Sequence, residues 1–146
     1  MGKVSLSEAK EMLQIFCNKY EFKGTVNDTT NGCMVVSPIW CTDLRRNCAL
    51  CFSIDGKMEV VTFSIVFGVV ENEIACLAYQ SSINKSGVLG FTCEITKKER
   101  QFMLLKQKSY ASDENFFMIL YSLLEDGLKI LDHNMSSMFA DATNPL

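Results

Sequence analysis

Two neighbouring stretches of alternating residues constrain the fold more than any other feature of this chain. The first runs from Cys48 to Ile54 and the second from about Met58 to Val70. Alternation with period two is typical of strands that bury one face, and in the first stretch it places one set of side chains together: Cys48, Leu50, Phe52 and Ile54. Asp55-Gly56 follows directly and favours a type I′ hairpin turn. The pattern therefore predicts two antiparallel strands.

The rest of the chain adds three helices and three further strands. Helical periodicity is found over Ser5–Tyr20, Glu71–Asn84 and Ser112–Phe139, and strand patterns over Cys33–Trp40, Val88–Ile95 and Arg100–Tyr110. Ser5 with Glu8 forms a capping box, and Ser112 is the expected cap of the last helix. Pro38 predicts a sheet edge, while residues 21–47 are the least regular part, and the tail Asp141–Leu146 is expected to fray.

This order of elements predicts the α+β class. Hairpins replace the crossovers that a parallel sheet needs, so we expect an antiparallel sheet packed against helices on one side, in the order α-β-β-β-α-β-β-α. The chain has 146 residues, 48% hydrophobic and 21% charged, which is typical of one globular domain spanning residues 1–146.

Charge and hydropathy exclude several classes of function. The net charge is -3 and no basic run exceeds two residues, so the basic face of a nucleic-acid binder is not expected. The apolar run Val60–Val70 is interrupted by Thr62, Ser64 and Gly68, so no membrane span is predicted. The first residues lack the pattern of a secretory signal, and a cytoplasmic location is the expectation.

The last helix is apolar over more than one stripe. Its apolar residues are Phe116, Phe117, Leu120, Tyr121, Leu123, Leu124, Leu128, Ile130, Leu131, Met135 and Met138. One small sheet cannot cover so wide a face, so the helix predicts a second packing partner, with another copy of this chain as the first choice. A homodimer is therefore expected.

The element order and a few landmarks resemble the YbjN-like family, whose fold is that of the type III secretion chaperones. The resemblance is carried by Cys48–Gly56, Val60–Phe67, the helix end Ile83-Asn84, the strand start Gly90-Phe91 and the closing helix. It covers about two-thirds of the chain and departs from the family pattern between Tyr20 and Asn47. The resemblance implies homodimers that engage other proteins without catalysis and without a cofactor.

Reactive chemistry has weak support. Cys48 and Cys51 form the only CxxC, but residues three apart on a strand point to opposite faces, so packed thiols are preferred over a zinc or redox site. A cysteine-dependent enzyme would need the sole histidine, His133, close to a thiol. We therefore predict no catalytic residue, no metal site and no cofactor, and the chain is not expected to be an enzyme.

The predicted function is protein interaction of the chaperone or adaptor type. Candidate partner-binding residues are Trp40, Ile39, Phe117, Leu124 and Leu128, because aromatic and large apolar residues dominate binding energy at interfaces. Trp40 either serves as an exposed anchor or folds back onto the sheet. The alternative function is small-molecule binding in an apolar pocket between sheet and helices, lined by residues such as Phe63, Phe67, Phe91 and Phe102.

Overall fold

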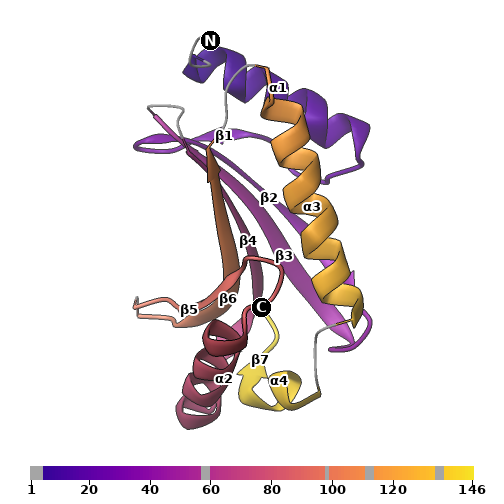
Figure 1. Ribbon diagram of the computed structural model, residues 1–146. Helices are drawn as coiled ribbons and strands as arrows, with labels where there is room; N and C mark the ends of the chain where they lie inside the picture. The colour runs from indigo at the N-terminus through magenta and orange to yellow at the C-terminus, as the bar shows by residue number, and fades with distance from the viewer. Residues whose placement is uncertain (1–4, 57–59, 98, 111–113, 134–136) are drawn as a thin grey trace.

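The computed structural model describes residues 5–56, 60–97, 99–110, 114–133 and 137–146 (Figure 1). The helices are α1 (Leu6–Lys19), α2 (Glu73–Ser86), α3 (Phe116–His133) and α4 (Ser137–Ala142). The strands are β1 (Asn27–Asp28), β2 (Gly32–Cys41), β3 (Arg46–Asp55), β4 (Val60–Val70), β5 (Thr92–Ile95), β6 (Phe102–Tyr110) and β7 (Thr143–Asn144).

All of these strands belong to one antiparallel sheet with helices on one side. The sheet has seven strands in the order β1-β2-β3-β4-β6-β5, and β7 pairs with the end of β4. Helix α1 lies at one end of the sheet, α3 runs from beside α1 along the sheet to the end of β2, and α2 and α4 lie together at the opposite end from α1 (Figure 1). The predicted α+β class is confirmed, and β1, α4 and β7 are additions to the predicted order.

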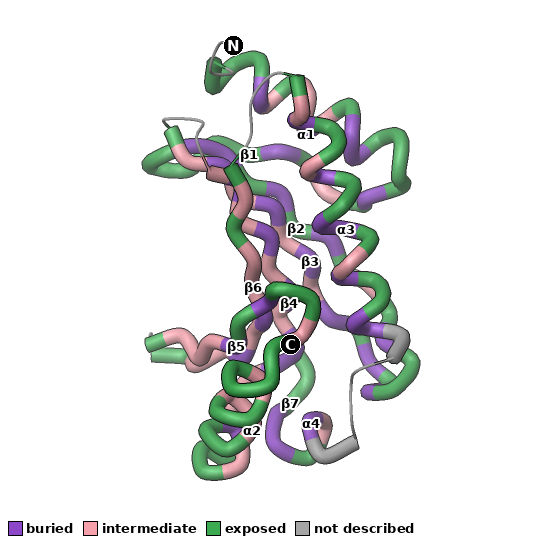
Figure 2. Tube along the Cα trace, viewed as in Figure 1, coloured by how far each residue is buried: buried purple, intermediate pink, exposed green. Residues whose placement is uncertain are grey.

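The central hairpin forms as its alternation predicts. Cys48 and Phe52 are buried while Cys51, between them, is half-buried, and the same alternation continues along β4 (Figure 2). β3 and β4 pair antiparallel, with Phe52 opposite Phe63. The predicted turn type is wrong, because neither Asp55 nor Gly56 has a positive φ.

The helix-covered face holds a continuous aromatic core. The ring of Phe52 lies 5.6 Å from that of Phe16 in α1 and 4.6 Å from that of Phe63, which lies 6.1 Å from that of Phe91. Helix α3 crosses closely enough that a Cβ on Gly127 would lie 2.6 Å from the Phe63 ring. Since that spacing leaves no room for a methyl group, the glycine allows α3 to approach the sheet.

The first helix begins where its cap predicts. The Ser5 hydroxyl accepts a hydrogen bond from the backbone N–H of Glu8 at 3.2 Å, which satisfies one of the free donors of the first turn. The buried stripe of α1 consists of Ala9, Leu13, Phe16 and Cys17. The predicted cap of the last helix, Ser112, lies outside the described residues.

The C-terminal residues are ordered into the sheet, so the predicted fraying is wrong. Helix α3 ends at His133, α4 follows as a separate short helix, and β7 pairs with Val69 and Val70. The buried guanidinium of Arg46 donates from Nη1 to the carbonyl oxygen of Thr143 at 3.1 Å and from Nη2 to its hydroxyl. Tertiary contacts from β3 therefore hold a tail that has no strong local preference of its own.

The strand predicted over Val88–Ile95 is shorter than expected. Residues Leu89 and Gly90 have φ values of 49° and 81°, and the N–H of Phe91 donates to the carbonyl of Val88 at 2.9 Å. Two successive left-handed residues form a tight turn, so the strand begins only at Thr92. Among the described helices, none combines the length and apolar character needed to cross a membrane.

Candidate protein-binding surfaces

The five predicted partner-binding residues lie on two different faces of the molecule. Ile39 and Trp40 are neighbours on β2, so their side chains project to opposite sides of the sheet. Ile39 packs against the core on the helix side, whereas Trp40 is 59% exposed on the face without helices. Trp40 is therefore not folded back into the interior. The five predicted partner-binding residues are divided between two surfaces of the molecule.

The first surface is a shallow depression on the helix side. It has a volume of about 230 Å³, and its apolar lining includes Tyr20, Phe22, Ile39, Leu50, Leu124 and Leu128. Glu21 and Lys23 line it as well. The fold thus brings three of the predicted residues together, because α3 crosses β2 and β3 next to the end of α1.

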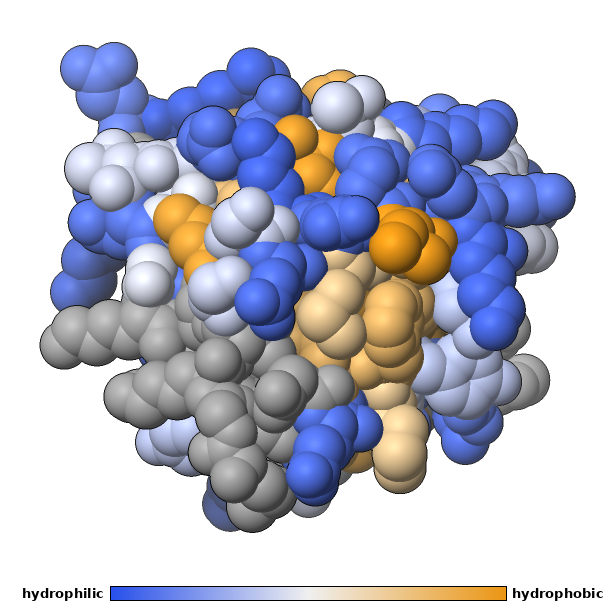
Figure 3. All heavy atoms as spheres, turned by 90° about the horizontal axis from the view of Figure 1, so that it is seen from above, coloured by the Kyte–Doolittle hydropathy of each residue, from blue (hydrophilic) through white to orange (hydrophobic). Residues whose placement is uncertain are grey.

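Farther along α3 lies a more exposed apolar surface, the α3 patch, formed by Phe117, Met118 and Tyr121. These side chains are 41%, 72% and 47% exposed, and the Tyr121 ring lies 5.5 Å from that of Tyr20. Not one residue from Phe116 to Leu124 is charged. Seen from the end where α1 and the start of α3 lie, apolar atoms gather in the middle of the surface between hydrophilic side chains (Figure 3).

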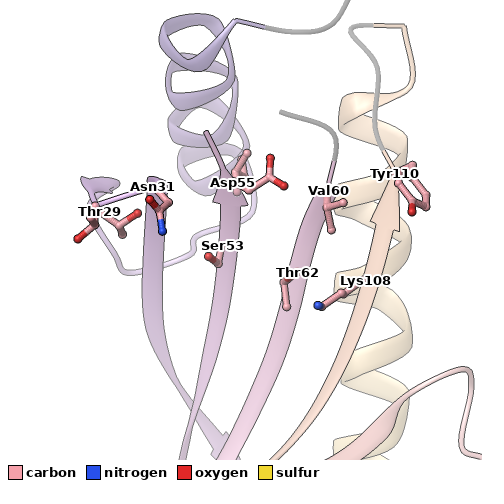
Figure 4. Close-up of a pocket in the computed structure, with 10 residues that line it drawn as sticks. Thr29, Asn31, Ser53, Asp55, Val60, Thr62, Lys108 and Tyr110 are labelled. Atoms are coloured by element: carbon pink, nitrogen blue, oxygen red, sulfur yellow. The ribbon is translucent and has the colours of Figure 1, made fainter. Parts of the chain in front are cut away.

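The second surface is the open face of the sheet, the side that carries no helix. At one end of it a polar depression of about 570 Å³ is lined by residues from the β1–β2 turn, β3, β4 and β6: Thr29, Thr30, Asn31, Ser53, Ile54, Asp55, Val60, Thr62, Lys108 and Tyr110 (Figure 4). Hydroxyl groups, one amine and one carboxylate line it. A polar, uncharged or zwitterionic ligand matches this chemistry better than an apolar one.

The cysteines are placed as packing residues. Six of the seven are buried, and Cys48 lies on the covered face while Cys51 lies on the open face, as predicted from their spacing. Burial raises the pKa of the Cys48 thiol to about 12 and that of Cys51 to about 11. A thiol with a raised pKa forms little thiolate at neutral pH and is a poor nucleophile. Within the described residues, no three His, Cys, Asp or Glu side chains gather closely enough to hold a metal ion.

The residues proposed for an apolar small-molecule pocket have two different locations. Phe63, Phe67 and Phe91 are core residues, and the Phe67 ring lies 4.7 Å from that of Phe139. Phe102 lies on the open face, because its neighbour Met103 is fully buried and side chains alternate along β6. Ring packing accounts for the first three without a ligand.

Sequence reasoning missed a row of apolar residues on the open face. Met34, Val36, Pro38 and Trp40 occupy every second position of β2, and all four are exposed. Their alternation with the buried Cys33, Val35 and Ser37 was a usable signal, but the irregular composition of this region and Pro38 obscured it. The row extends the surface that Trp40 belongs to.

Comparisons with known proteins show a shared fold. A scan against protein-family models finds no match, and a search of the curated proteins finds none either. Among solved structures, the crystal structure of YbjN, a candidate transcription regulator from E. coli, is similar, with a TM-score of 0.51 over 83% of this chain and 87% of that chain. The two sequences are 14% identical, so the similarity concerns the fold alone. The YbjN-like fold is thereby confirmed, and the secretion-chaperone assignment stays a prediction.

Proposed function

We propose that this chain is a non-catalytic protein-interaction domain of the chaperone or adaptor type that works as a homodimer in the cytoplasm. Seven cysteines with free thiols suit a reducing compartment. The raised pKa values of the buried thiols argue against nucleophilic chemistry. The proposed activity is therefore binding through an exposed surface, and the α3 patch is the main observation that supports it.

The observation that carries the proposal is the uncharged, exposed first half of α3. Met118 is 72% exposed, and Phe117 and Tyr121 beside it are also exposed. A solvent-facing helix normally carries charged residues on its outer side, whereas a helix that is apolar all round is normally covered. Aromatic residues and methionine are also the residue types that interfaces select. The α3 patch therefore has the composition of a contact surface.

A second copy of this chain is the occupant that the α3 patch fits best. In a twofold dimer the same surface meets itself, so any charge near the axis would face a like charge. The segment Phe116–Leu124 has no charge to repel its copy. The helix-side depression with Leu124 and Leu128 continues along the same helix and would lie at the rim of such an interface.

Sedimentation velocity tests this proposal. We expect the wild type to have twice the chain mass of 16.4 kDa at micromolar concentration. Met118→Glu should raise the dimer dissociation constant at least tenfold, because it buries a charge against its copy. Ile74→Glu is the matched control, since Ile74 is 82% exposed on α2 and should not affect the dimer. A monomeric wild type, or equal effects of both variants, would contradict the homodimer.

The polar depression on the open face favours a second candidate, small-molecule binding. Its volume of about 570 Å³ lies within the range of ligand sites. A thermal-shift screen of polar metabolites tests it, because a specific ligand stabilises the folded state by an amount that grows with the logarithm of its concentration over its dissociation constant. Any stabilising compound should lose its effect on Lys108→Ala and Thr62→Ala, which both line the depression.

A further inference from the structure

Among the described residues, no helix covers the open face of the sheet. Every open-face residue of β3 and β4 is exposed or half-buried, whereas each residue between them is buried under the helices (Figure 2). On the flanking strands the exposure increases, with Val36 and Lys108 both exposed. Nothing among the described residues packs over the middle of this face as α1 and α3 pack over the other.

Side-chain size gives the open face a concave profile, here called the trough. The floor is formed by the small residues of the two central strands, Ala49, Cys51, Ser53, Thr62, Ser64 and Val66. The walls are formed by larger residues of the flanking strands, Met34, Val36 and Pro38 on β2 and Leu104, Lys106 and Lys108 on β6. The strand register places these sets side by side: Val36 pairs with Cys51, Cys51 with Ser64, and Ser64 with Lys106.

The dimensions of the trough match an α-helix. Three strand spacings of about 4.8 Å separate β2 from β6, so the walls are about 14 Å apart. A helix with its side chains is about 10–12 Å wide. From Asp55 to Cys51, short of the Ala49 end that Pro145 and Leu146 line, the free length is about 14 Å, the length of a helix of about nine residues.

The sheet edges are closed to an added strand, so a partner would have to lie across the face. On the β2 side, β1 pairs with Cys33 and Met34, and farther along β2 the N–H of Lys23 donates to the Ser37 hydroxyl at 2.9 Å and Pro38 lacks a donor. On the β5 edge, the Asn84 amide takes the place of a strand: its oxygen accepts from the N–H of Cys93 at 2.6 Å and its nitrogen donates to the Cys93 carbonyl at 3.0 Å. Both edges are therefore protected.

The two walls differ in charge, which defines the partner. The β2 wall is apolar, whereas the β6 wall carries Lys106, which forms an ion pair with Glu94, and the exposed Lys108. A helix lying in the trough would place its apolar row against the β2 wall and small residues over the floor, where Ser53, Thr62 and Ser64 carry hydroxyl groups. Acidic residues on its other flank would meet the exposed Lys108, beside the Lys106–Glu94 ion pair.

The chain's own last residues already occupy one end of the trough. Pro145 and Leu146 line a depression of about 390 Å³ together with Val36, Pro38 and Ala49. Apolar polypeptide is thus accommodated against this face. The free length lies between this tail and Tyr110 at the opposite end, where the polar depression is found.

We propose that the trough binds an amphipathic α-helix of a partner protein through about nine of its residues, with one apolar row toward the β2 wall and an acidic flank facing Lys108. This inference rests on the proposed function and gives the domain a second surface beside the α3 patch. The contact area is below that of a standard protein interface, so binding is of the transient, micromolar class.

Selection from a displayed library of helix-forming 16-residue peptides tests the trough. The library carries an apolar row, and its flanking positions are randomised among Asp, Glu, Lys, Arg and Ser. Clones selected on the wild type are then measured on Ser64→Arg, which fills the floor, and on the matched control Ser82→Arg, on an exposed site of α2. Lys108→Glu tests whether the charge of the β6 wall selects the peptides. It also replaces Ser64→Arg as the test variant if Ser64→Arg lowers the unfolding midpoint, because Lys108 is exposed.

We expect recovered clones to be acidic on one flank, to bind Ser64→Arg at least tenfold more weakly, and to bind Ser82→Arg as they bind the wild type. Repeating the selection on Lys108→Glu should favour Lys or Arg on that flank. The trough proposal is overturned by clones that bind Ser64→Arg normally, by clones sensitive to Met118→Glu instead, by flanks without charge bias, or by no clones above background. Sedimentation velocity tests the proposed homodimer independently of the peptide selection. Failure of the proposed function can therefore be distinguished from failure of the trough proposal.

Discussion

The two faces of the sheet use the same strands for different purposes. On the covered face, the side chains of β3 and β4 are large and aromatic, and they contact α1, α3 and α4. On the open face, the residues of the same strands are small, and none is fully buried. The covered face packs against helices of the same chain, whereas the open face has small side chains with free space above them. A strand can serve both because its side chains alternate.

The comparison also separates stability from binding. Burial of large apolar side chains supplies most of the free energy of folding, so the covered face should account for the stability of the domain. Exposed surface contributes little to stability and is free to serve recognition. The predictions below test this division from the largest effect to the smallest.

Adjacent residues on β4 give the sharpest contrast between the faces. Phe63→Ala should lower the free energy of unfolding by about 3–5 kcal/mol, because it leaves a cavity among the rings of Phe52 and Phe91. Ser64→Ala, one position later on the open face, should change it by less than about 0.5 kcal/mol. Urea denaturation monitored by circular dichroism measures both. Similar losses for the two variants would break the division of roles.

The C-terminal tail connects the two faces, and Thr143 fixes it to the covered side. Thr143→Val should cost about 1.5–3 kcal/mol, because the buried Arg46 guanidinium loses a hydroxyl acceptor while its Nε already has no partner. Amide exchange at Glu71 and Asn72, whose N–H groups donate to Ala142, should become faster. Thr25→Val, at an exposed site, is the control and should leave both measurements unchanged.

The protected β5 edge belongs to the covered side through α2. Asn84→Ala should destabilise the protein by about 1–2 kcal/mol, since the Cys93 N–H and carbonyl lose the amide that pairs with them. Hydrogen exchange at Cys93 should increase. Asn18→Ala removes an exposed hydrogen bond with Gln14 on α1 and should have an effect below about 0.5 kcal/mol. No change in exchange at Cys93 would show that Asn84 does not close the edge.

The smallest effect at neutral pH is expected from the thiols. They distinguish the two faces because a reagent in solution reaches the open face more easily than the covered one. Cys51 should react with a thiol reagent before Cys48, although burial raises the pKa of both, to about 11 and about 12. The Cys48 thiol ionises at a lower pH in the unfolded chain than in the folded one. Its contribution to the free energy of unfolding is therefore fully present below pH 9 and is lost as the pH rises toward 12.

Cys48→Ala isolates this pH dependence from that of other groups. The variant should lose less stability than the wild type between pH 9 and pH 11, even if it is less stable throughout. Urea midpoints across that range provide the measurement. Parallel curves for the two proteins would show that the Cys48 thiol does not contribute.

Sequence patterns recovered those elements whose burial is periodic. The β3–β4 hairpin, the N-terminal cap of α1 and the edge position of Pro38 follow from alternation, hydrogen-bonding groups and a missing donor, all of which act locally. The order of β5 at the far edge and the attachment of β7 to β4 depend on contacts between distant residues. Gly68 illustrates this: a Cβ there would lie 2.3 Å from the Asn144 carbonyl oxygen, a closeness that no local pattern indicates.

The candidate surfaces show the same limit. Trp40 and Phe117 are exposed apolar residues, as their selection from the sequence requires. The sequence did not indicate which of the selected residues share a surface. Ile39 and Trp40 are adjacent in sequence and lie on opposite faces. Met34 and Val36, which share a face with Trp40, were not predicted. Grouping requires knowing which face the helices cover, and that is decided by tertiary packing.

By itself, the sequence determined which side chains of each strand point the same way, where α1 begins, and that the segment Phe116–Leu124 carries no charge. These properties follow from local geometry and composition. Only the tertiary structure decided which face of each strand the helices cover, that the tail joins β4, and that small residues of two strands lie between the larger residues of their neighbours. Such arrangements arise from contacts between segments far apart in the chain, whose energies depend on the whole fold.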